Sequence, residues 1–471
     1  MERITLKKVV TRFAPSPTGT LHIGGVRTAL FNYVYAKKYD GLFLVRIEDT
    51  DRERSTKEFE KNILDSLNSI GLCPDLDPIN QSKRNNIYTA AAQKLIDSNQ
   101  AYYCDCSVEE LDQMRAEQQS KGQKPQYDGR SRDKNLSKSE NTVLRLKTPL
   151  DGEVIVKDCV RGDVIFNNSE LDDLIILRSD GTPTYHLCNV VDDFEQGVTT
   201  VIRGEDHLSN TPRQIHIQNA LGYPELEYAH LPLVLGADKK RLSKRHAATS
   251  LEDYQAEGYL DSAILNTLAR LGWSKGEKEI FYLNDLIADF EITEVQKAGA
   301  IFDITKLDYL NAQHMSNLDL NDFIDHLTPF LNLKGIEISN HPKVEILIDA
   351  MRSSANTFDG VASNLLCYYQ DISEYNQKAI QKFIGSNTEI LIDLRDELAN
   401  LESWTEESLD EILVQYRNKK ELSVPNVNQP IRIALTGSTN SPSLGMTLFL
   451  FEKYEALKRI DNLIKFVQPD S

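Results

Sequence analysis

Hydrophobic residues in the first hundred positions alternate between short apolar runs and stripes with helical spacing. Residues 8–13 and 42–47 are short apolar runs, which predict buried strands. After each run, apolar side chains recur at the spacing of one helix face, over 26–38 and over 59–70. The order strand, helix, strand, helix predicts a parallel sheet with helical crossovers.

The pattern changes near residue 101 and again near residue 256. A polar, helix-prone stretch to about residue 124 is followed by short β-like runs at 143–146, 154–156, 164–166 and 174–177. The α/β pattern then returns, with apolar runs at 198–202 and 231–235 and a helix beginning near Pro212. Beyond residue 256 the strand signals fade, and helical periodicity marks 260–271, 320–331, 344–351, 389–401, 406–416 and 448–466.

These patterns predict an α/β core, an α+β insertion within it and an all-α region after it. Single hydrophobic cores stop growing near about 250–300 residues, so a chain of 471 residues is expected to form several domains. The boundaries we expect are 1–100 and 191–255 for the two halves of the core, 101–190 for the insertion, and 256–320 and 321–471 for two helical regions.

Composition and charge fit a folded protein but do not indicate its partner. Hydrophobic residues make up 40% and charged residues 26%, which is an ordinary globular balance. The net charge is -18, and nucleic-acid binders usually carry a basic surface. Binding depends on local charge, however, so a basic stripe on an acidic protein can still hold phosphates. Only specific motifs can therefore decide whether RNA is a partner.

The lack of targeting signals and the small number of cysteines favour a reduced cytoplasmic protein. The N-terminus lacks the apolar stretch and cleavage site of a secretory signal, and no apolar run approaches the length of a membrane span. Six cysteines are too sparse for a disulfide framework in a chain of this length. We expect no membrane association.

The segment 11–25, TRFAPSPTGTLHIGG, carries the first chemical signal. A strand ends, a Pro/Gly turn follows, and His22, Gly24 and Gly25 open a helix. Glycines let backbone approach a ligand, a helix N-terminus attracts phosphate, and a histidine can donate to phosphate oxygens. HIGG alone is explained more simply as a tight turn, and no GxGxxG fingerprint indicates a dinucleotide.

The segment 239–246, KKRLSKRH, places five cations around one serine. Taken alone, it is at least as easily a solvated basic loop or a patch that contacts RNA backbone. The functional interpretation is a loop that neutralises triphosphate charge during a reaction.

Longer strings of sequence resemble a known family. APSPTGTLHIGG followed by VRTALFNYVYA is similar to the first signature of class I aminoacyl-tRNA synthetases, in the wording of the glutamyl branch, and 241–245 (RLSKR) resembles their second signature, KMSKS. The segments 45–52, 179–193 and 201–207 match the same branch. Nearly the whole chain thus resembles bacterial glutamyl-tRNA synthetases. Gly25 stands where the first signature ends in His, Arg241 where the second begins with Lys, and Ala247 where Gly is usual.

This resemblance implies a doubly wound Rossmann-type catalytic core, an insertion for the tRNA acceptor end, a helical stem-contact region and a helical anticodon-binding region. The implied reaction is ATP-dependent activation of L-glutamate to glutamyl-adenylate, followed by transfer to the terminal ribose of tRNA. ATP would be accompanied by Mg²⁺, held largely by phosphates and water. The family further implies a monomer, and activation that requires bound tRNA.

The resemblance also assigns residues. The implied catalytic residues are His22 and Lys244. The implied ATP contacts are His22, Gly24, Gly25, Arg241, Ser243, Lys244 and Arg245. The implied glutamate contacts are Arg12, Ser16, Glu48, Tyr185, Asn189 and Arg203. Among them, Arg203 is expected to meet the side-chain carboxylate and Glu48 the α-ammonium. The alternative for each is a structural polar contact, such as an arginine paired with an aspartate.

Two further features bear on metal and tRNA choice. Cys104 and Cys106 suggest a metal site, but structural zinc needs four ligands, and Ser131 and its neighbours stand where relatives supply the others, so we expect no zinc.

In the tail, 430–438 and Ser441–Pro442 resemble the anticodon-binding region. Arg352 and Ser354 fall near the expected anticodon-reading site. Ser354 lies closer to the position where the family often uses Arg, which leaves selection between glutamate and glutamine tRNAs open.

Four alternatives remain to be weighed. A glutaminyl-tRNA synthetase is disfavoured by the HIGG wording and by a helical tail where β-barrels are expected. A truncated relative that glutamylates a modified tRNA base would end near the catalytic core. A small-molecule adenylyltransferase leaves the tail unexplained. A non-catalytic RNA-binding or regulatory protein is disfavoured because both signatures are present, although fold alone never guarantees activity.

Overall fold

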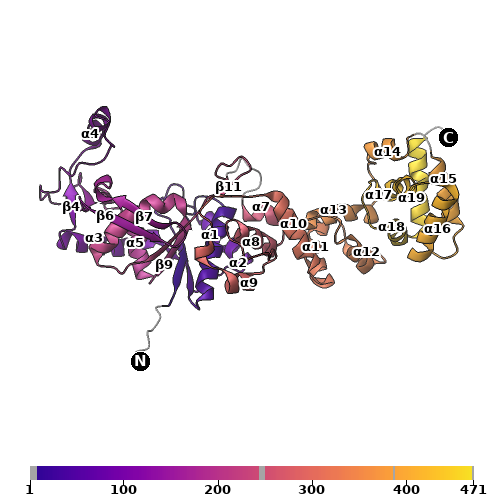
Figure 1. The fold of residues 1–471 in the computed structure, drawn as a ribbon, viewed down its shortest axis with the longest axis horizontal. Coiled ribbons are helices and arrows are strands. Elements are labelled where there is room, and N and C mark those ends of the chain that lie inside the picture. The colour runs from indigo at the N-terminus through magenta and orange to yellow at the C-terminus, as the bar shows by residue number, and fades with distance from the viewer. Residues whose placement is uncertain (1–7, 243–249, 386–387, 469–471) are drawn as a thin grey trace, which may run out of the picture. The chain divides into compact units, whose positions relative to one another are not determined.

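The computed structural model describes residues 8–242, 250–385 and 388–468. It divides into two compact units: Met1–Asp253 with Ile264–Asp303, and Tyr254–Ala263 with Ile304–Ser471. Strands gather in the indigo and magenta part of Figure 1, and the orange and yellow part is helical. No helix in the described ranges is both long and apolar enough to cross a membrane.

The start of the first unit has the predicted strand–helix order. β1 (Val10–Phe13) pairs in parallel with β2 (Leu42–Ile47), which pairs in parallel with β3 (Ile79–Asn80). The crossovers carry α1 (Ile23–Lys38) and α2 (Lys57–Ser69). Thr199 extends this sheet beyond β1, because its backbone N–H donates to Val10 O at 2.9 Å.

A second sheet has the order β7-β6-β10-β9. β9 (Thr200–Gly204) and β10 (Glu227–Leu231) belong to the predicted second half of the core, whereas β6 (Glu153–Asp158) and β7 (Gly162–Asn167) come from the predicted insertion. β6 nevertheless pairs in parallel with β10, at Tyr228 and Asp158. The insertion therefore supplies a hairpin to the core sheet, which short-range patterns could not reveal.

The rest of the insertion forms its own small sheet. β5 (Val143–Leu146) lies between β4 (Ala101–Cys104) and β8 (Ile175–Leu177), antiparallel to both. β4 occupies the start of the stretch expected to be helical, and α4 (Val108–Ser120) follows it with a capping box at Ser107. α3 (Asn85–Asp97), α5 (Tyr185–Glu195) and α6 (Thr211–Leu221) share an apolar core with β4, β5 and β8.

The apolar run 231–235 is split by Pro232, which has no N–H to give to a sheet. β11 (Val234–Leu235) pairs instead with β12 (Ala300–Ile301), a strand in the region expected to be helical. Further along the chain lie α7 (Leu251–Ala256), α8 (Asp261–Arg270) and α9 (Leu283–Asp289). The fold class predicted for this part is confirmed, with these corrections to single elements.

In the described residues of the second unit, helices are joined by turns and loops, and no strand is present, as predicted. Its helices from Ile304 onward are α10 (Ile304–Ser316), α11 (Leu320–Leu333), α12 (Val344–Met351), α13 (Phe358–Tyr369), α14 (Gln377–Phe383), α15 (Glu389–Ala399), α16 (Glu406–Lys420), α17 (Val424–Thr436), α18 (Leu444–Leu450) and α19 (Lys453–Val467). The single helix expected over 448–466 is broken at Phe451 and Glu452, which have extended backbone. The Trp404 indole N–H lies 3.1 Å from Leu448 O and 3.0 Å from Phe451 O and satisfies carbonyls at this break.

Candidate active site

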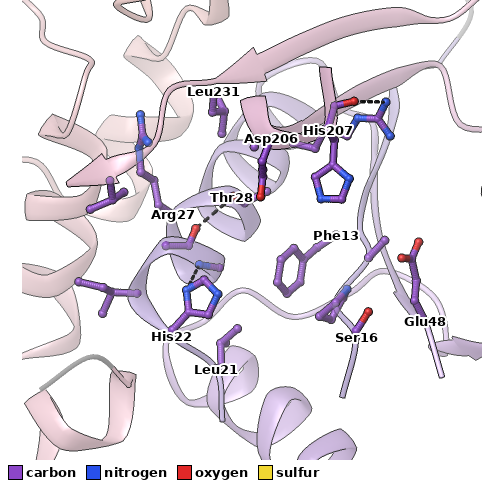
Figure 2. A pocket seen from close by; sticks show the side chains of 18 of the residues that line it. Phe13, Ser16, Leu21, His22, Arg27, Thr28, Glu48, Asp206, His207 and Leu231 are labelled. Carbon is purple, nitrogen blue, oxygen red and sulfur yellow. Dashed lines mark hydrogen bonds between the residues drawn. The ribbon is translucent and has the colours of Figure 1, made fainter. Parts of the chain in front are cut away.

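A cavity of about 600 Å³ opens in the first unit, where β1, β2 and β9 end. Ligand sites of open α/β sheets lie at the carboxyl ends of their strands, which is where this cavity lies. Figure 2 shows His22, Arg27 and Thr28 on one side of it and Ser16 and Glu48 on the other. The sequence-predicted residues that line it are Arg12, Ser16, His22, Gly24, Gly25, Glu48, Tyr185, Asn189, Arg203 and Arg241.

The helix start at His22 explains both glycines of the HIGG string. His22 is the N-cap of α1, and its Nδ1 accepts from the Gly25 N–H at 3.0 Å (Figure 2). A Cβ on Gly24 would lie 3.1 Å from that same Nδ1, and one on Gly25 would lie 3.0 Å from Leu21 Cδ1. The Gly25 N–H is thus used by the cap, so a ligand would meet the helix start at Gly24 and at the imidazole.

The His22 ring is held as a neutral hydrogen-bond donor. Because Nδ1 accepts from Gly25, the proton of the neutral ring belongs on Nε2. Burial, followed by the positive charge of Arg241, lowers the pKa of His22. The site can therefore offer a phosphate oxygen an N–H without a change in protonation near neutral pH.

A buried charge network anchors the far side of the cavity. Asp193 accepts from Arg46 Nη1 at 2.6 Å and from Arg12 Nε at 3.1 Å. Burial would raise the pKa of Asp193, but the charges of the two arginines outweigh it and hold that pKa below its usual value. Arg12 thus makes the structural contact weighed as the alternative to ligand binding, and it does so while lining the cavity.

Glu48 places a carboxylate in this side of the cavity. Asn189 Nδ2 donates to Glu48 Oε1 at 2.9 Å, and Arg46 Nη2 lies 3.6 Å from the same oxygen. Burial raises the pKa of Glu48, against the opposing charges of Arg46 and Arg12. A cationic group placed beside Glu48 would relieve the cost of burying this carboxylate.

Arg203 offers the complementary charge. Its Nε donates to His230 Nε2 at 3.2 Å, and its Nη2 donates to Thr211 Oγ1 at 2.8 Å and Gln214 Oε1 at 2.7 Å. Its Nη1 is buried and has no hydrogen-bond partner among the described residues. Unsatisfied buried donors are rare in folded proteins, and a ligand carboxylate would satisfy this one.

Several cavity residues escaped the sequence analysis. Arg27 lies on the buried face of α1, donates through Nη1 to Pro232 O at 2.7 Å, and has its pKa lowered to about 10 by burial. Asp206 lies 3.3 Å from Arg241 Nη1, and His207 Nδ1 lies 3.1 Å from the Tyr185 hydroxyl. An arginine inside an otherwise apolar helical stripe was the one signal that could have found Arg27.

Comparison with known families agrees with this architecture. The family described as "tRNA synthetases class I (E and Q), catalytic domain" matches residues 8–309, and "Anticodon binding domain" matches residues 322–464. The chain belongs to the class I tRNA synthetases of the E and Q type. The resemblance drawn from the motifs is thereby confirmed.

Individual relatives of this class I synthetase cover almost all of it. It is 44% identical to glutamate–tRNA ligase 2 of Halorhodospira halophila, over 97% of this chain and 98% of the relative. It is also 44% identical to the glutamate–tRNA ligase of Thermodesulfovibrio yellowstonii, over 97% and 99%. Among solved structures, a glutamate tRNA ligase from Elizabethkingia meningosepticum in complex with its amino acid is similar, with TM-score 0.87, 31% identity, and coverage of 98% and 100%.

The second signature of this synthetase is described only in part. Arg241 is exposed over 62% of its side chain and reaches the cavity beside Asp206. Ser243, Lys244 and Arg245 lie outside the described residues. Their assignment rests on the sequence signature.

The cysteine pair of the synthetase lies within a hydrogen-bonded cluster. Cys104 Sγ is 3.3 Å from the Tyr127 hydroxyl, which also accepts from the Ser131 N–H at 3.0 Å. Cys106 Sγ lies 3.8 Å from Ser131 Oγ. Within the part of the chain that the structure describes, no three His, Cys, Asp or Glu side chains are grouped to hold a metal.

Arg352 and Ser354 lie in the second unit. The Arg352 guanidinium donates to Leu318 O and lies 5.1 Å from the centre of the Phe323 ring. The Ser354 hydroxyl is buried and has no hydrogen-bond partner among the described residues. Arg352 is thus engaged in the packing of its own unit, whereas Ser354 keeps an unused hydroxyl.

Proposed function

We propose that this class I synthetase is a glutamate–tRNA ligase that activates L-glutamate with ATP and transfers it to the terminal ribose of tRNA. The observation that carries the proposal is the free, buried Nη1 of Arg203 in the same cavity as the buried Glu48 carboxylate. An amino acid with an acidic side chain supplies both complementary charges. The names of the relatives that match along the whole chain, all glutamate–tRNA ligases, support the same substrate.

In the bound state, Arg203 would receive the side-chain carboxylate of glutamate and Glu48 its α-ammonium. Tyr185, Asn189, Arg12 and Ser16 line the same cavity. Asn189 holds Glu48 in place through the 2.9 Å hydrogen bond. Two opposite charges at fixed positions orient the substrate so that its α-carboxylate is left for reaction.

ATP would lie on the His22 side of the cavity. His22 donates from Nε2 to a phosphate oxygen, Gly24 lets the nucleotide approach the helix start, and Arg241 adds positive charge. The signature residues Ser243, Lys244 and Arg245 complete this set, with Lys244 stabilising charge on the α- and β-phosphates. Mg²⁺ enters with ATP as part of the substrate and neutralises phosphate charge.

The first step joins an α-carboxylate oxygen of glutamate to the α-phosphorus of ATP, and the bond from that phosphorus to pyrophosphate breaks. Such a step needs positioning and charge neutralisation, not a protein nucleophile. In the second step a ribose hydroxyl of tRNA attacks the activated carbonyl. The hydroxyl proton is released and AMP leaves, which forms the ester.

The remaining parts of the chain are proposed to bind tRNA: 101–190 the acceptor end, 256–320 the stem and 321–471 the anticodon, with Arg352 and Ser354 near the bases. The zinc-free state of the Cys104–Cys106 cluster, a monomeric form and a cytoplasmic location are parts of the same proposal. The hydrogen bonds around Tyr127 support a cluster that holds together without metal.

The test is aminoacylation with L-glutamate, ATP and Mg²⁺, run in parallel on tRNA for glutamate and tRNA for glutamine. Charging of the glutamate tRNA alone is expected of a discriminating ligase. Charging of both would keep the chemistry and show that Ser354 accepts either anticodon. Charging of neither would reject the proposed function and favour a non-catalytic RNA-binding protein.

A further inference from the structure

The side chain that would recognise the substrate carboxylate is fixed by residues outside the proposed binding set. Arg203 uses its Nε on His230 and its Nη2 on Thr211 and Gln214. These contacts occupy one edge of the guanidinium, and only Nη1 remains without a partner in the described chain. The orientation of that free nitrogen therefore depends on what holds the opposite edge.

His230 can hold Arg203 in only one tautomer. Arg203 Nε carries a hydrogen and has no acceptor capacity, so His230 Nε2, at 3.2 Å, must be the acceptor. The proton of the ring is then on Nδ1, which lies 2.6 Å from Asp158 Oδ2. Both side chains are fully buried, and burial lowers the pKa of His230, which keeps the ring neutral.

Asp158 is built to accept this proton donor. Its Oδ1 accepts from the backbone N–H groups of Val160 at 2.9 Å and Arg161 at 2.7 Å. Its Oδ2 accepts from the His230 backbone N–H at 3.0 Å as well as from the ring. Every donor that faces the carboxylate needs an acceptor, so a protonated or amide side chain would not fit the same contacts.

We propose that Asp158 and His230 are positioning residues that fix the tautomer and orientation needed for Arg203 to present Nη1 to the substrate carboxylate. Asp158 ends β6, so the hairpin contributed by the insertion reaches the amino-acid pocket through this pair. The inference rests on the proposed function, because it specifies how the glutamate side chain is selected.

Two substitutions of His230 separate its contact with Arg203 from its contact with Asp158. In His230→Gln the longer amide reaches the place of Nε2 and can still accept from Arg203. In His230→Asn the shorter amide reaches the place of Nδ1 and leaves Arg203 Nε unpaired. Leaving a buried donor unpaired should raise the KM for glutamate by about tenfold or more in His230→Asn, against about threefold or less in His230→Gln. The kcat and the KM for ATP should stay close to wild type in both.

Asp158→Asn provides a second, independent variant. Whichever way the amide is turned, its NH₂ group faces donors: the backbone N–H groups of Val160 and Arg161 in one orientation, and the ring and backbone N–H of His230 in the other. In the second orientation the amide favours the His230 tautomer with the proton on Nε2. That proton would oppose the Arg203 Nε–H, so the KM for glutamate should rise at least as much as in His230→Asn. The matched control is His216→Asn. His216 is a buried histidine on α6 whose Nε2 contacts Asn168 Oδ1 at 2.9 Å, so this variant should lose stability without a change in the KM for glutamate.

All variants are compared with the wild-type full chain by aminoacylation at saturating tRNA and by thermal unfolding. The inference is supported if the KM for glutamate rises in His230→Asn and Asp158→Asn. It should not rise in the same way in His230→Gln and His216→Asn. Equal KM values in all folded variants, or equal rises in both His230 variants, overturn it while wild-type charging leaves the proposed function standing. A wild type that charges no tRNA with glutamate overturns both.

Discussion

The two ends of the cavity, to which we assign the amino acid and the nucleotide, are built in different ways. At the amino-acid end Arg203 and Glu48 are 6% and 8% exposed, and each is tied to neighbours by hydrogen bonds. At the nucleotide end Arg241 is exposed over 62% of its side chain and forms an ion pair with Asp206 at 3.3 Å. Buried, pre-oriented charges discriminate between ligands strongly, whereas exposed charges mainly neutralise a highly charged one. Selectivity should therefore reside at the first end and charge neutralisation at the second.

Arg203→Ala tests the amino-acid end and should have the largest effect. Removing one partner of a buried charge pair leaves the other uncompensated, so kcat/KM for glutamate should fall about a thousandfold, or ~4 kcal/mol. The KM for ATP should change little, because Arg203 is not part of the proposed nucleotide set. Steady-state aminoacylation with each substrate varied separately provides the measurement, and a parallel rise in both KM values would contradict the division between the two ends.

Lys244→Ala tests the nucleotide end. Because Lys244 is proposed to stabilise charge that develops on the phosphates, adenylate formation should slow about a hundredfold while ATP affinity changes much less. Single-turnover activation and equilibrium ATP binding measure the two quantities. Lys240→Ala, which removes an exposed neighbouring cation outside the signature, is the control and should behave like wild type. An unchanged activation rate in Lys244→Ala would remove Lys244 from the mechanism.

The pH dependence of the two KM values sharpens the comparison further. In its proposed role Glu48 binds the ammonium only when ionised, and its pKa is raised by burial, so it takes up a proton at a higher pH than an ordinary glutamate. As pH falls below neutrality, the KM for glutamate should therefore rise by about tenfold for each unit below the Glu48 pKa. The pKa of His22 is lowered by burial and by Arg241, so His22 takes up a proton at a lower pH than an ordinary histidine, and the KM for ATP should stay flat close to neutral pH.

Glu48→Gln checks the origin of that pH dependence. The variant should have a raised KM for glutamate at every pH and should lack the additional rise on acidification. If the acid limb persists in Glu48→Gln, another group near the amino-acid end is responsible for it.

The Cys104–Cys106 cluster is a third region, for which we expect no effect of metal removal. The Ser131 backbone N–H already donates to the Tyr127 hydroxyl at 3.0 Å, and zinc would need four good ligands there. Metal analysis should find well below one zinc per chain. After treatment with a zinc chelator, and once excess Mg²⁺ has been added back, the enzyme should have its full activity. A stoichiometric zinc content would show that this cluster binds metal.

Much of the fold could be predicted because it depends on short-range patterns. The apolar run 42–47 and the stripe 26–38 correspond to β2 and to most of α1, since burial of one face determines their period. The break at Phe451 was missed, and the partner of its carbonyl there is the indole of Trp404, which lies far away along the chain. The pairing of β6 with β10 was also missed, because parallel partners are joined by a crossover of about a dozen residues or more and are not neighbours in the sequence.

The site divides in a similar way between what motifs indicate and what only packing reveals. His22, Glu48 and Arg203 stand inside recognisable strings, so the sequence alone identified residues that the fold brings into one cavity. Asp158, His230 and Gln214 carry no such signal. Even so, His230 and Gln214 contact Arg203, Asp158 contacts His230, and Gln214 also donates to Asn189.

By itself, the sequence determined most of the order of strands and helices and the family, because these depend on periodicity and on short motifs. Only the tertiary structure decided which side chains share a buried hydrogen-bond network, which ring nitrogen of His230 faces Arg203, and which nitrogen of Arg203 has no partner among the residues described. Those properties arise from contacts between residues as far apart as Asp158 and His230, and such contacts exist only after the strands have paired.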